Sequence, residues 1–336
     1  MVTIAEVARH AGVSSSTVSY VLSGKRTIST ETRERVERSI AELGYYRHAG
    51  ARALASSKSN IVALMLPLRS DMYMPVMAEI TIAVTATARE FGYDVLLMTS
   101  DEGPSGVRRV SGSGLADAMV LLDIALDDER IPAVRDTKAP AVLIGVPADP
   151  TGLSCVDLDF AAAGVMCANH LADLGHREVA LIGSASGVYR RHTGFAERTL
   201  EGFRITAAER GLRFVHRPCE GNYTSTAGTV ARIFEERPET TGIVVQNESA
   251  LVHLPGLLRQ AGRAVPEDVS LLAICGRDAA EHAFPPITGV PIPAAEMGRQ
   301  AVELAVSIMD EGAPGHTVLL PPELIQRQSS GPAPTR

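Results

Sequence analysis

Hydroxyl side chains gather in one short stretch near the N-terminus, where residues 14–20 read Ser-Ser-Ser-Thr-Val-Ser-Tyr. If Val18 and Val21 point inward at helical spacing, the outward face carries Ser15, Ser16, Thr17, Ser19 and Tyr20. A solvated helix usually carries long charged residues, and Ser and Thr form helices poorly. Short hydroxyl side chains would let this helix lie against base edges and phosphates in a DNA major groove. From this face alone, an ordinary polar surface is an equally good interpretation.

The flanking residues predict the helices that would hold this stretch in place. Thr3 and Glu6 have the spacing of a capping box that starts a first helix. Gly12 permits a tight turn, Ser14 caps the second helix and Gly24 ends it. A third helix is expected to begin near Ser29, to bury Val36, Ile40 and Leu43, and to stop at Gly44. Three short helices with a tight turn between the first two predict a helix-turn-helix.

Charge is distributed unevenly along the chain. The net charge is −7, yet the first 60 residues hold nine basic side chains against five glutamates. These residues therefore carry +4 and the remainder −11. A basic head on an acidic body suits phosphate contact at one end only.

The N-terminal residues resemble the LacI/GalR family of transcriptional regulators in order and spacing. The matching segments are Thr3-Ile4, Val7-Ala8, Ala11-Gly12-Val13-Ser14, Thr17-Val18-Ser19, Val21-Leu22, Thr32-Arg33 and Leu43-Gly44-Tyr45. The resemblance implies that Ser15, Ser16 and Tyr20 read bases, with Thr17 on the same face. It implies phosphate contacts from Thr3, Ser14, Ser19, Ser29, Thr32 and Tyr45.

Residues 48–55 resemble the hinge helix of the same family, in which a leucine wedges into the minor groove. The hinge residues implied to contact DNA are His48, Ala51 and Leu54, with Leu54 as the wedge. A minor packing role is the alternative for Leu54. The family usually has Asn at the position of His48, and Gly50 weakens helix formation. We therefore expect the hinge to be disordered away from DNA and to fold as a dimer on its operator.

Beyond residue 60, short β-branched runs alternate with amphipathic stretches, which predicts parallel sheets connected by helices. The predicted strands are 61–67, 94–99, 118–123, 141–146, 178–183, 214–218, 242–246 and 269–274. Segments 173–183, 199–204, 265–274, 296–304 and 319–330 resemble the periplasmic-binding-protein-like core of the family. The resemblance implies two doubly wound lobes with crossovers near 160, 290 and 322. It also implies a ligand cleft at the carboxyl ends of the strands.

The cleft departs from the pattern of sugar-binding family members. Asn247 is kept, but Thr199 stands at a usual arginine position and Cys275 at a usual aspartate position. The candidate effector-binding residues are Tyr73, Asp123, Arg190, Phe195, Arg198, Tyr223, Asn247, Cys275 and Arg277. A sugar or sugar derivative is favoured by the family, while a modified or oligomeric sugar, a non-sugar metabolite or no effector remain alternatives.

Other chemistries lack their motifs. The glycine-rich segment 111–118 precedes a predicted strand, whereas a dinucleotide-binding motif follows one. Ala185 stands where an esterase needs its nucleophile, and the four cysteines lack metal-ligand spacing. We predict no catalytic residue, metal or cofactor, and hence no enzyme. The N-terminus lacks the features of a signal peptide, and no apolar stretch is long enough to span a bilayer.

The expected organisation is a helix-turn-helix domain (1–46), a hinge and linker (47–60), a ligand-sensing and dimerisation core (61–330) and a disordered tail (331–336). The predicted function is that of a cytoplasmic, nucleoid-associated homodimer that binds palindromic operator DNA under control of a small-molecule effector. Repression is preferred over activation, although polymerase contacts leave no readable mark. The alternatives are a solute-binding protein that shares the core and a core with catalytic activity.

Overall fold

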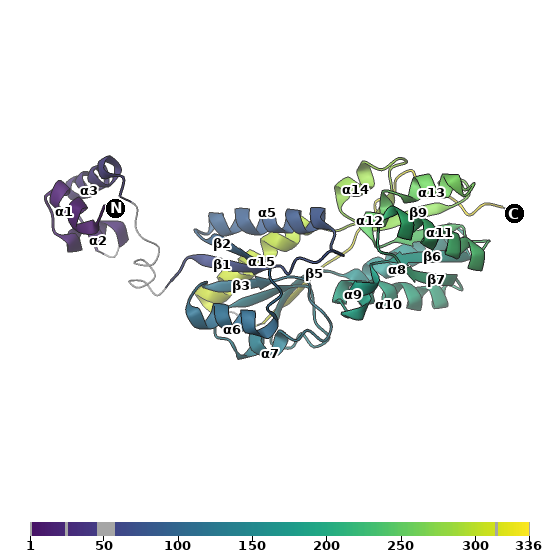
Figure 1. Ribbon diagram of the computed structural model, residues 1–336, viewed down its shortest axis with the longest axis horizontal. Helices are drawn as coiled ribbons and strands as arrows, with labels where there is room; N and C mark the ends of the chain where they lie inside the picture. The colour runs from purple at the N-terminus through teal and green to yellow at the C-terminus, as the bar shows by residue number, and fades with distance from the viewer. Residues whose placement is uncertain (1, 24–25, 46–57, 313–314, 336) are drawn as a thin grey trace. The chain divides into compact units, whose positions relative to one another are not determined.

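The computed structural model describes residues 2–23, 26–45, 58–312 and 315–335. The chain divides into two compact units, residues 1–59 and residues 60–336 (Figure 1). Within the described residues, no helix is long and apolar enough to cross a membrane.

The N-terminal unit is a bundle of three helices, α1 (Ile4–Ala11), α2 (Ser15–Ser23) and α3 (Thr30–Leu43). The predicted capping box is confirmed, since the Thr3 N–H donates to Glu6 Oε2 at 2.7 Å and the Glu6 N–H donates to Thr3 Oγ1 at 3.3 Å. Gly12 and Gly44 end α1 and α3 at φ of 64° and 59°, a left-handed conformation that favours glycine. The buried core of the unit is Val7, Ala8, Ala11, Val18, Val21 and Val36.

The first lobe of the second unit is a six-stranded sheet in which all paired strands run parallel, in the order β11-β5-β4-β3-β1-β2. The strands are β1 (Ile61–Met65), β2 (Asp94–Met98), β3 (Ala118–Leu121), β4 (Ala141–Ile144), β5 (Ser154–Leu158) and β11 (Thr317–Leu320). Helices α5 (Met74–Glu90) and α15 (Ala294–Glu311) cover one face, and α6 (Gly103–Ser113) and α7 (Ile131–Asp136) cover the other (Figure 1). Alternation along β1 explains its continuous apolar run, because Val62 and Leu64 pack toward α5 and α15 whereas Ala63 and Met65 pack toward α6 and α7.

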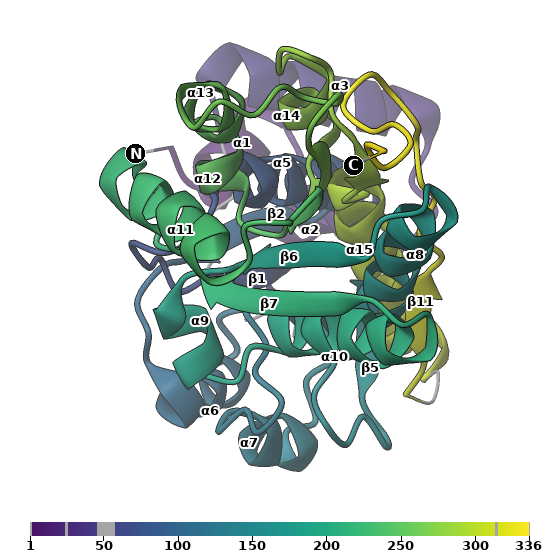
Figure 2. The same ribbon diagram turned by 90° about the vertical axis from the view of Figure 1, so that its right-hand side faces the viewer.

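The second lobe repeats this arrangement around a parallel five-stranded sheet, in the order β10-β9-β8-β6-β7. The strands are β6 (Glu178–Gly183), β7 (Arg213–Pro218), β8 (Gly242–Val245), β9 (Ser270–Cys275) and β10 (Thr288–Pro291). One face packs against α8 (Phe160–Asp173) and α10 (Gly194–Glu209), with α9 (Ser186–Arg190) following β6. The other face packs against α11 (Tyr223–Glu236), α12 (Glu248–Leu251), α13 (Leu254–Gln260) and α14 (Arg277–Glu281). Figure 2 shows α11 and α10 on opposite sides of β6 and β7.

The chain passes between the lobes three times, which makes the two sheets one folding unit. It crosses between β5 and α8, between β10 and α15, and again after β11, where Gly289 and Ile325 exchange backbone hydrogen bonds. These crossings were expected near 160, 290 and 322. Strands β5, β10 and β11 were not predicted, because each is short and two of them carry an internal Asp157 or Gly289 that breaks the apolar run.

The C-terminal segment corrects one expectation, that residues 331–336 are disordered. Among the described residues 331–335, the Ala333 N–H donates to the carbonyl oxygen of Leu174 in the second lobe at 2.8 Å. The Gly331 carbonyl accepts from Ser270 Oγ at 3.0 Å and lies 3.2 Å from Nε2 of the buried His176. A segment of Ser, Gly and Pro looks like a flexible tail, but here its backbone groups find partners on the lobe.

Candidate functional site

The outward face of α2 carries the hydroxyl groups expected from the sequence. Ser15 and Ser16 are exposed and Thr17 and Ser19 are half-buried, whereas Val18 is fully buried. The helix begins at a serine cap, since Ser14 Oγ accepts from the Thr17 N–H at 3.1 Å and lies 2.8 Å from Ser16 Oγ. The outward surface of α2 is therefore polar and carries short side chains, and its inward side packs on the apolar core of the unit.

An aromatic ring and a cation extend this surface at the end of α2. The Arg26 guanidinium lies 5.7 Å from the centre of the Tyr20 ring, and Tyr20 is partly exposed. A positive charge beside the hydroxyl face suits contact with phosphate groups.

The residues expected to contact phosphates serve first as helix caps. Thr3 caps α1, and its hydroxyl donates to Glu6 Oε2 at 2.9 Å. Ser29 caps α3 by accepting from the Thr32 N–H, and its hydroxyl donates to Thr32 Oγ1 at 2.9 Å. Tyr45 is half-buried against the helical core. The hinge residues His48, Ala51 and Leu54 lie outside the described residues.

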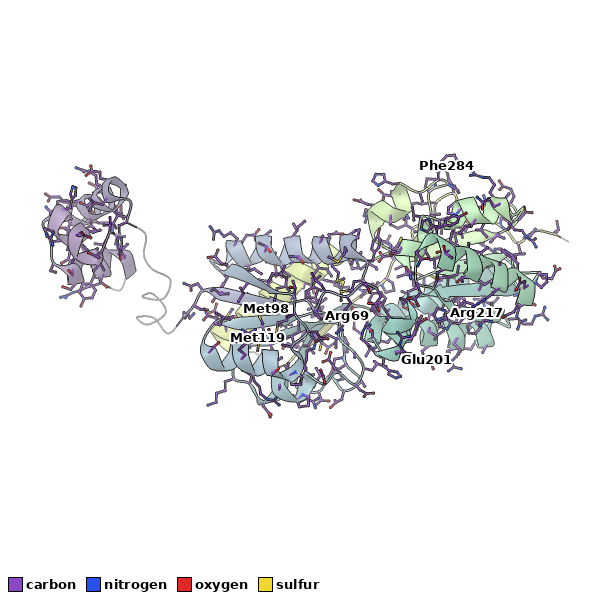
Figure 3. The ribbon with its side chains drawn as sticks, in the orientation of Figure 1. Arg69, Met98, Met119, Glu201, Arg217 and Phe284 are labelled. Carbon is purple, nitrogen blue, oxygen red and sulfur yellow. The ribbon has the colours of Figure 1, made fainter. Side chains whose placement is uncertain are left out.

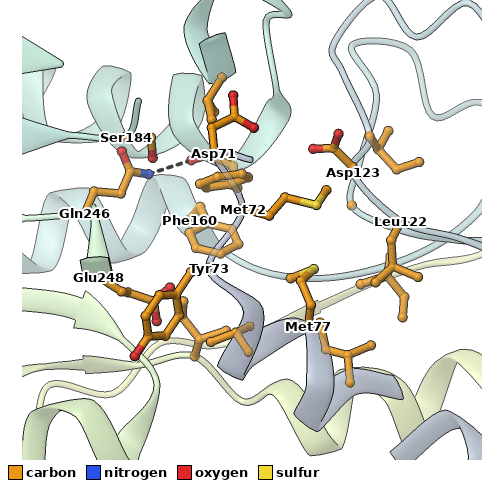
Figure 4. A pocket seen from close by; sticks show the side chains of 18 of the residues that line it. Asp71, Met72, Tyr73, Met77, Leu122, Asp123, Phe160, Ser184, Gln246 and Glu248 are labelled. Carbon is orange, nitrogen blue, oxygen red and sulfur yellow. Dashed lines mark hydrogen bonds between the residues drawn. The ribbon is translucent and has the colours of Figure 1, made fainter. Parts of the chain in front are cut away.

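A cavity of about 140 Å³ lies between the two lobes of the second unit (Figure 4). The first lobe contributes the start of α5 and the residues that follow β3, β4 and β5. The second lobe contributes the residues that follow β6 and β8. Ligands of open parallel sheets bind at such carboxyl ends of strands.

Four of the nine candidate effector-binding residues line this cavity. They are Tyr73, Asp123, Phe195 and Asn247. Tyr73 immediately precedes α5, and Asn247 caps α12 by accepting from the N–H groups of Ser249 and Ala250. Asp123 lies at a φ of 57° and accepts from Arg69 Nε at 2.9 Å.

Arg190 and Arg198 are placed outside the cavity lining. Arg190 ends the short helix α9 and is exposed, while the next residue, Arg191, points to the cavity. Arg198 instead joins the lobes, because its guanidinium donates to the carbonyl oxygens of Val146 and Pro147 at 2.7 and 3.0 Å. Thr199 is fully buried where α10 crosses α8, and a Cβ on Gly164 would meet its carbonyl oxygen at 2.3 Å.

Tyr223, Cys275 and Arg277 are also not among the residues that line the cavity. Tyr223 is the first residue of α11 and packs edge-on against the His253 ring. Cys275 ends β9 with its side chain in the buried cluster beneath α11, α13 and α14, because alternate residues of β9 face that side. Arg277 is exposed on α14 and pairs with Glu281.

Four ionisable side chains of the cavity lining were not among the candidates from the sequence. Asp71 and Arg191 form an ion pair between the lobes, and Asp157 and Glu248 contribute two further carboxyl groups. One signal was available for Glu248, since it directly follows Asn247 at the end of a predicted strand. Asp157 lay in a strand that was not predicted.

Burial controls the charge state of these two carboxyl groups. Desolvation raises the pKa of Glu248 to about 8, against an opposing contribution from the Gly276 N–H, which donates to it at 2.7 Å. Desolvation likewise raises the pKa of Asp157 to about 7, although the Arg198 charge opposes this rise. Both groups are therefore partly protonated near neutral pH.

A helix-turn-helix carried on the same chain as a two-lobed α/β unit with an interlobe cavity defines a DNA-binding regulator with an effector-binding domain. Comparison with known proteins identifies the family. Residues 3–48 match the family described as bacterial regulatory proteins, lacI family, and residues 168–330 match the periplasmic binding protein-like domain. The chain belongs to the LacI family of transcriptional regulators, whose members are not enzymes.

Two relatives illustrate the similarity in sequence. The chain is 30% identical to the HTH-type transcriptional regulator CelR of Thermobifida fusca, over 97% of this chain and 98% of the relative. It is 26% identical to catabolite control protein A of Priestia megaterium, over 98% and 99% of the two chains.

Two solved structures share the fold over nearly the whole length. A CelR–cellobiose complex matches with a TM-score of 0.70 at 27% identity, covering 98% of this chain and 100% of the other. The Lac repressor dimer bound to operator and the anti-inducer ONPF matches with a TM-score of 0.87 at 21% identity, covering 98% and 99%. The predicted fold class of a helical headpiece and two parallel-sheet lobes is thereby confirmed.

Proposed function

We propose that this regulator is a repressor that binds a palindromic operator as a homodimer in the cytoplasm, at the nucleoid. The observation that carries this proposal is the exposed hydroxyl face of α2, capped by Ser14 and backed by buried Val18. On this face Ser15, Ser16 and Tyr20 read base edges. Ser14, Ser19, Thr17 and the caps Thr3 and Ser29 contact the backbone, together with Thr32 and Tyr45. Two-fold symmetry of the protein requires inverted symmetry of the site.

The hinge completes the DNA contact in this proposal. Leu54 of each subunit enters the minor groove, flanked by His48 and Ala51, and the energy of unstacking is offset by contacts to the bent duplex. A ligand between the lobes changes the spacing of the two hinges and so the stability of the wedge. Allosteric coupling of this kind is typically about 1–3 kcal/mol, or roughly 5- to 150-fold in affinity.

Exposed apolar side chains support dimerisation through the second unit. Ile82 is 69% exposed on α5, and Leu97 is exposed on β2, an edge strand of the first sheet. Val252 and Phe284 are exposed on the second lobe, where Figure 3 shows Phe284 at its surface. A second copy of the chain would cover such a surface and an open strand edge.

The effector site in this proposal is the interlobe cavity, with Tyr73, Asp123, Phe195 and Asn247 among its contacts. Because this chain is similar to CelR, the complex of CelR with cellobiose supports a sugar or sugar derivative as its effector. Thr199 and Cys275 stand where sugar-binding members of the family usually have arginine and aspartate, which argues against a standard monosaccharide.

Footprinting on DNA from around the gene tests the proposal. The dimer is expected to protect one discrete site with inverted symmetry, and Ser16→Ala is expected to need a higher protein concentration for the same protection. Ser111→Ala, an equivalent serine change on α6, is the matched control and should leave the footprint unchanged. Diffuse protection, or a protected site without inverted symmetry, would contradict the proposal.

A further inference from the structure

The interlobe cavity is lined mainly by apolar side chains. The apolar lining residues include Met72, Met77, Ile80, Leu122, Phe160 and Met297. Its volume of about 140 Å³ is close to the roughly 150 Å³ of a protein cavity that holds benzene. A compact ligand with an apolar body fits this space better than a polyol, whose hydroxyl groups each need a partner.

The amide side chains at the cavity are already used by the protein. Asn247 Oδ1 accepts from Ser249 N–H at 3.0 Å, and its Nδ2 donates to Cys219 O at 2.5 Å. Gln246 accepts from the Tyr189 hydroxyl and donates to Phe195 O, both at 3.2 Å. These amides have little hydrogen-bonding capacity left for sugar hydroxyl groups.

The cavity also has more carboxyl groups than cations. Among its described lining residues, Arg191 is the one cation, and it is engaged by Asp71. Asp123 pairs with Arg69, but neither Glu248 nor Asp157 forms an ion pair with any described residue. The lining thus offers two carboxyl groups without a cationic partner among the described residues to whatever fills it.

Each of these two carboxyl groups keeps an oxygen available. Glu248 Oε1 accepts from the Gly276 N–H at 2.7 Å, and Asp157 Oδ1 accepts from the Leu158 N–H at 3.0 Å. Within the described part of the chain, Glu248 Oε2 and Asp157 Oδ2 accept no hydrogen bond, and Asp157 is only 3% exposed. Figure 4 shows the Glu248 carboxyl group beside the ring of Tyr73. An aromatic face and a carboxylate together form a good receptor for a cation.

We propose that the effector is a compact apolar compound bearing a basic nitrogen, of the alkylammonium or arylalkylammonium class. Its ammonium group is received by Glu248 and the ring of Tyr73, and its apolar body occupies the methionine- and phenylalanine-lined part of the cavity. Asp157 is a second acceptor for the charged end. This inference rests on the proposed role of the cavity as the effector site and names the class of ligand.

Binding of 2-phenylethylamine to the full-length protein, followed by calorimetry and thermal shift, tests this inference. Its matched neutral probe is 2-phenylethanol, and cellobiose and glucose represent sugars. The amine is expected to bind at least about tenfold more tightly than the alcohol. Glu248→Gln keeps an acceptor for the Gly276 N–H, and it should abolish the preference for the amine without changing the affinity for the alcohol. Glu235→Gln, an exposed carboxyl on α11, is the control and should bind as the unaltered protein does.

The pH profile gives an independent readout. Amine affinity should rise between pH 6 and 8.5, because an ammonium group binds the ionised form of Glu248, whose pKa lies near 8. The titratable groups that face Glu248 are Glu79, Tyr73 and Cys275, and those that face Asp157 are Arg198, Asp159 and Cys155. The Glu248→Gln variant should show a flatter profile.

Equal binding of amine and alcohol, an amine preference that survives Glu248→Gln, or binding of the sugars alone would each overturn the inference. So would no binding of the amine at millimolar concentration. Operator footprinting with the same protein separates this outcome from failure of the proposed function. A symmetric footprint without amine binding overturns only the ligand class, whereas loss of the footprint overturns the DNA-binding proposal itself.

Discussion

Arg191 of the second lobe donates two hydrogen bonds to the carboxylate of Asp71 in the first lobe, from Nη1 to Oδ2 at 2.9 Å and from Nη2 to Oδ1 at 3.1 Å. The Asp71 side chain is 14% exposed and both residues line the cavity. The approach depends on Gly187, where a Cβ would meet Asp71 Oδ2 at 2.4 Å. The two lobes are therefore joined by a charged pair at the place where a ligand would bind.

Asp71→Asn should loosen the contact between the lobes. Loss of the carboxylate leaves the partly buried Arg191 charge without its partner, which should lower the free energy of unfolding by about 1–3 kcal/mol. Scattering from the variant in solution should also show a larger radius of gyration. The matched control is Glu201→Gln, which breaks an exposed pair that Arg204 also makes through two hydrogen bonds, and it should change the free energy of unfolding much less. Equal losses in the two variants would argue against a special role for the interlobe pair.

Glu248 should make stability depend on pH. Its pKa in the folded protein is raised to about 8 by burial, so the folded state holds a proton that the unfolded state releases near 4.5. The resulting stabilisation is complete below about pH 4.5 and is lost as the pH rises through 8. Glu248→Gln should therefore melt several degrees higher than the unaltered protein at pH 9 and nearly equally at pH 5. Thermal melts across this range check the prediction, with Glu235→Gln as control. Parallel curves for Glu248→Gln and the unaltered protein would refute it.

Ser16→Ala should weaken specific DNA binding more than non-specific binding. The hydroxyl of Ser16 is exposed on the face assigned to base contacts, and loss of one base contact typically costs about 1–3 kcal/mol. Titrations with operator and with random duplex at one salt concentration measure both affinities. A Ser16→Ala variant that lost the same factor on both duplexes would assign Ser16 to backbone contact.

Leu54→Ala should reduce DNA bending together with operator affinity. In the proposed complex the Leu54 wedge unstacks a base step. Its loss should then relax the bend, which energy transfer between dyes on the two ends of the duplex detects. Affinity for random duplex is expected to stay within about twofold, since in this proposal the wedge forms only on the operator. An unchanged bend angle would contradict the wedge and favour the alternative, a packing role for Leu54.

Truncation after Gln328 should destabilise the second lobe. The Ser329 carbonyl accepts from the Leu271 N–H at 2.7 Å, and the Ser329 hydroxyl accepts from the Thr288 N–H at 2.8 Å. Leu271 and Thr288 both lie in the sheet of the second lobe. Removing Ser329 leaves buried donors unpaired, which costs about 1–3 kcal/mol each. Truncation after Ala333 keeps these contacts and is the control. If the two truncated proteins melt alike, the segment contributes nothing to the lobe.

Much of the headpiece was predictable because its determinants are local. Thr3 and Glu6 lie three residues apart and Gly12 and Gly44 each stand at a helix end, so backbone preference and a few hydrogen bonds specify them. The central strands were also predictable, since a sheet covered on both faces requires continuous apolar runs such as 61–65.

The cavity was only partly predictable, because its lining depends on how two lobes meet. Arg191 lines it and Arg190 does not, a difference of one residue in the short helix α9. Arg198 donates to backbone carbonyl groups of the other lobe. The side chain of Cys275 lies in the core, because alternate residues of β9 face that side. None of these outcomes is encoded in the spacing of neighbouring residues.

The sequence by itself determined the hydroxyl-bearing helix, its caps and the family resemblance, because those features depend on residues a few positions apart. Only the tertiary structure decided that Asp71 meets Arg191 across the lobes and that Glu248 and Asp157 face the cavity without an ion-pair partner among the described residues. The Asp71–Arg191 contact joins residues 120 positions apart, and three crossings between the sheets bring the lining segments together. Side-chain environment at such a place is a property of packing, which no local pattern contains.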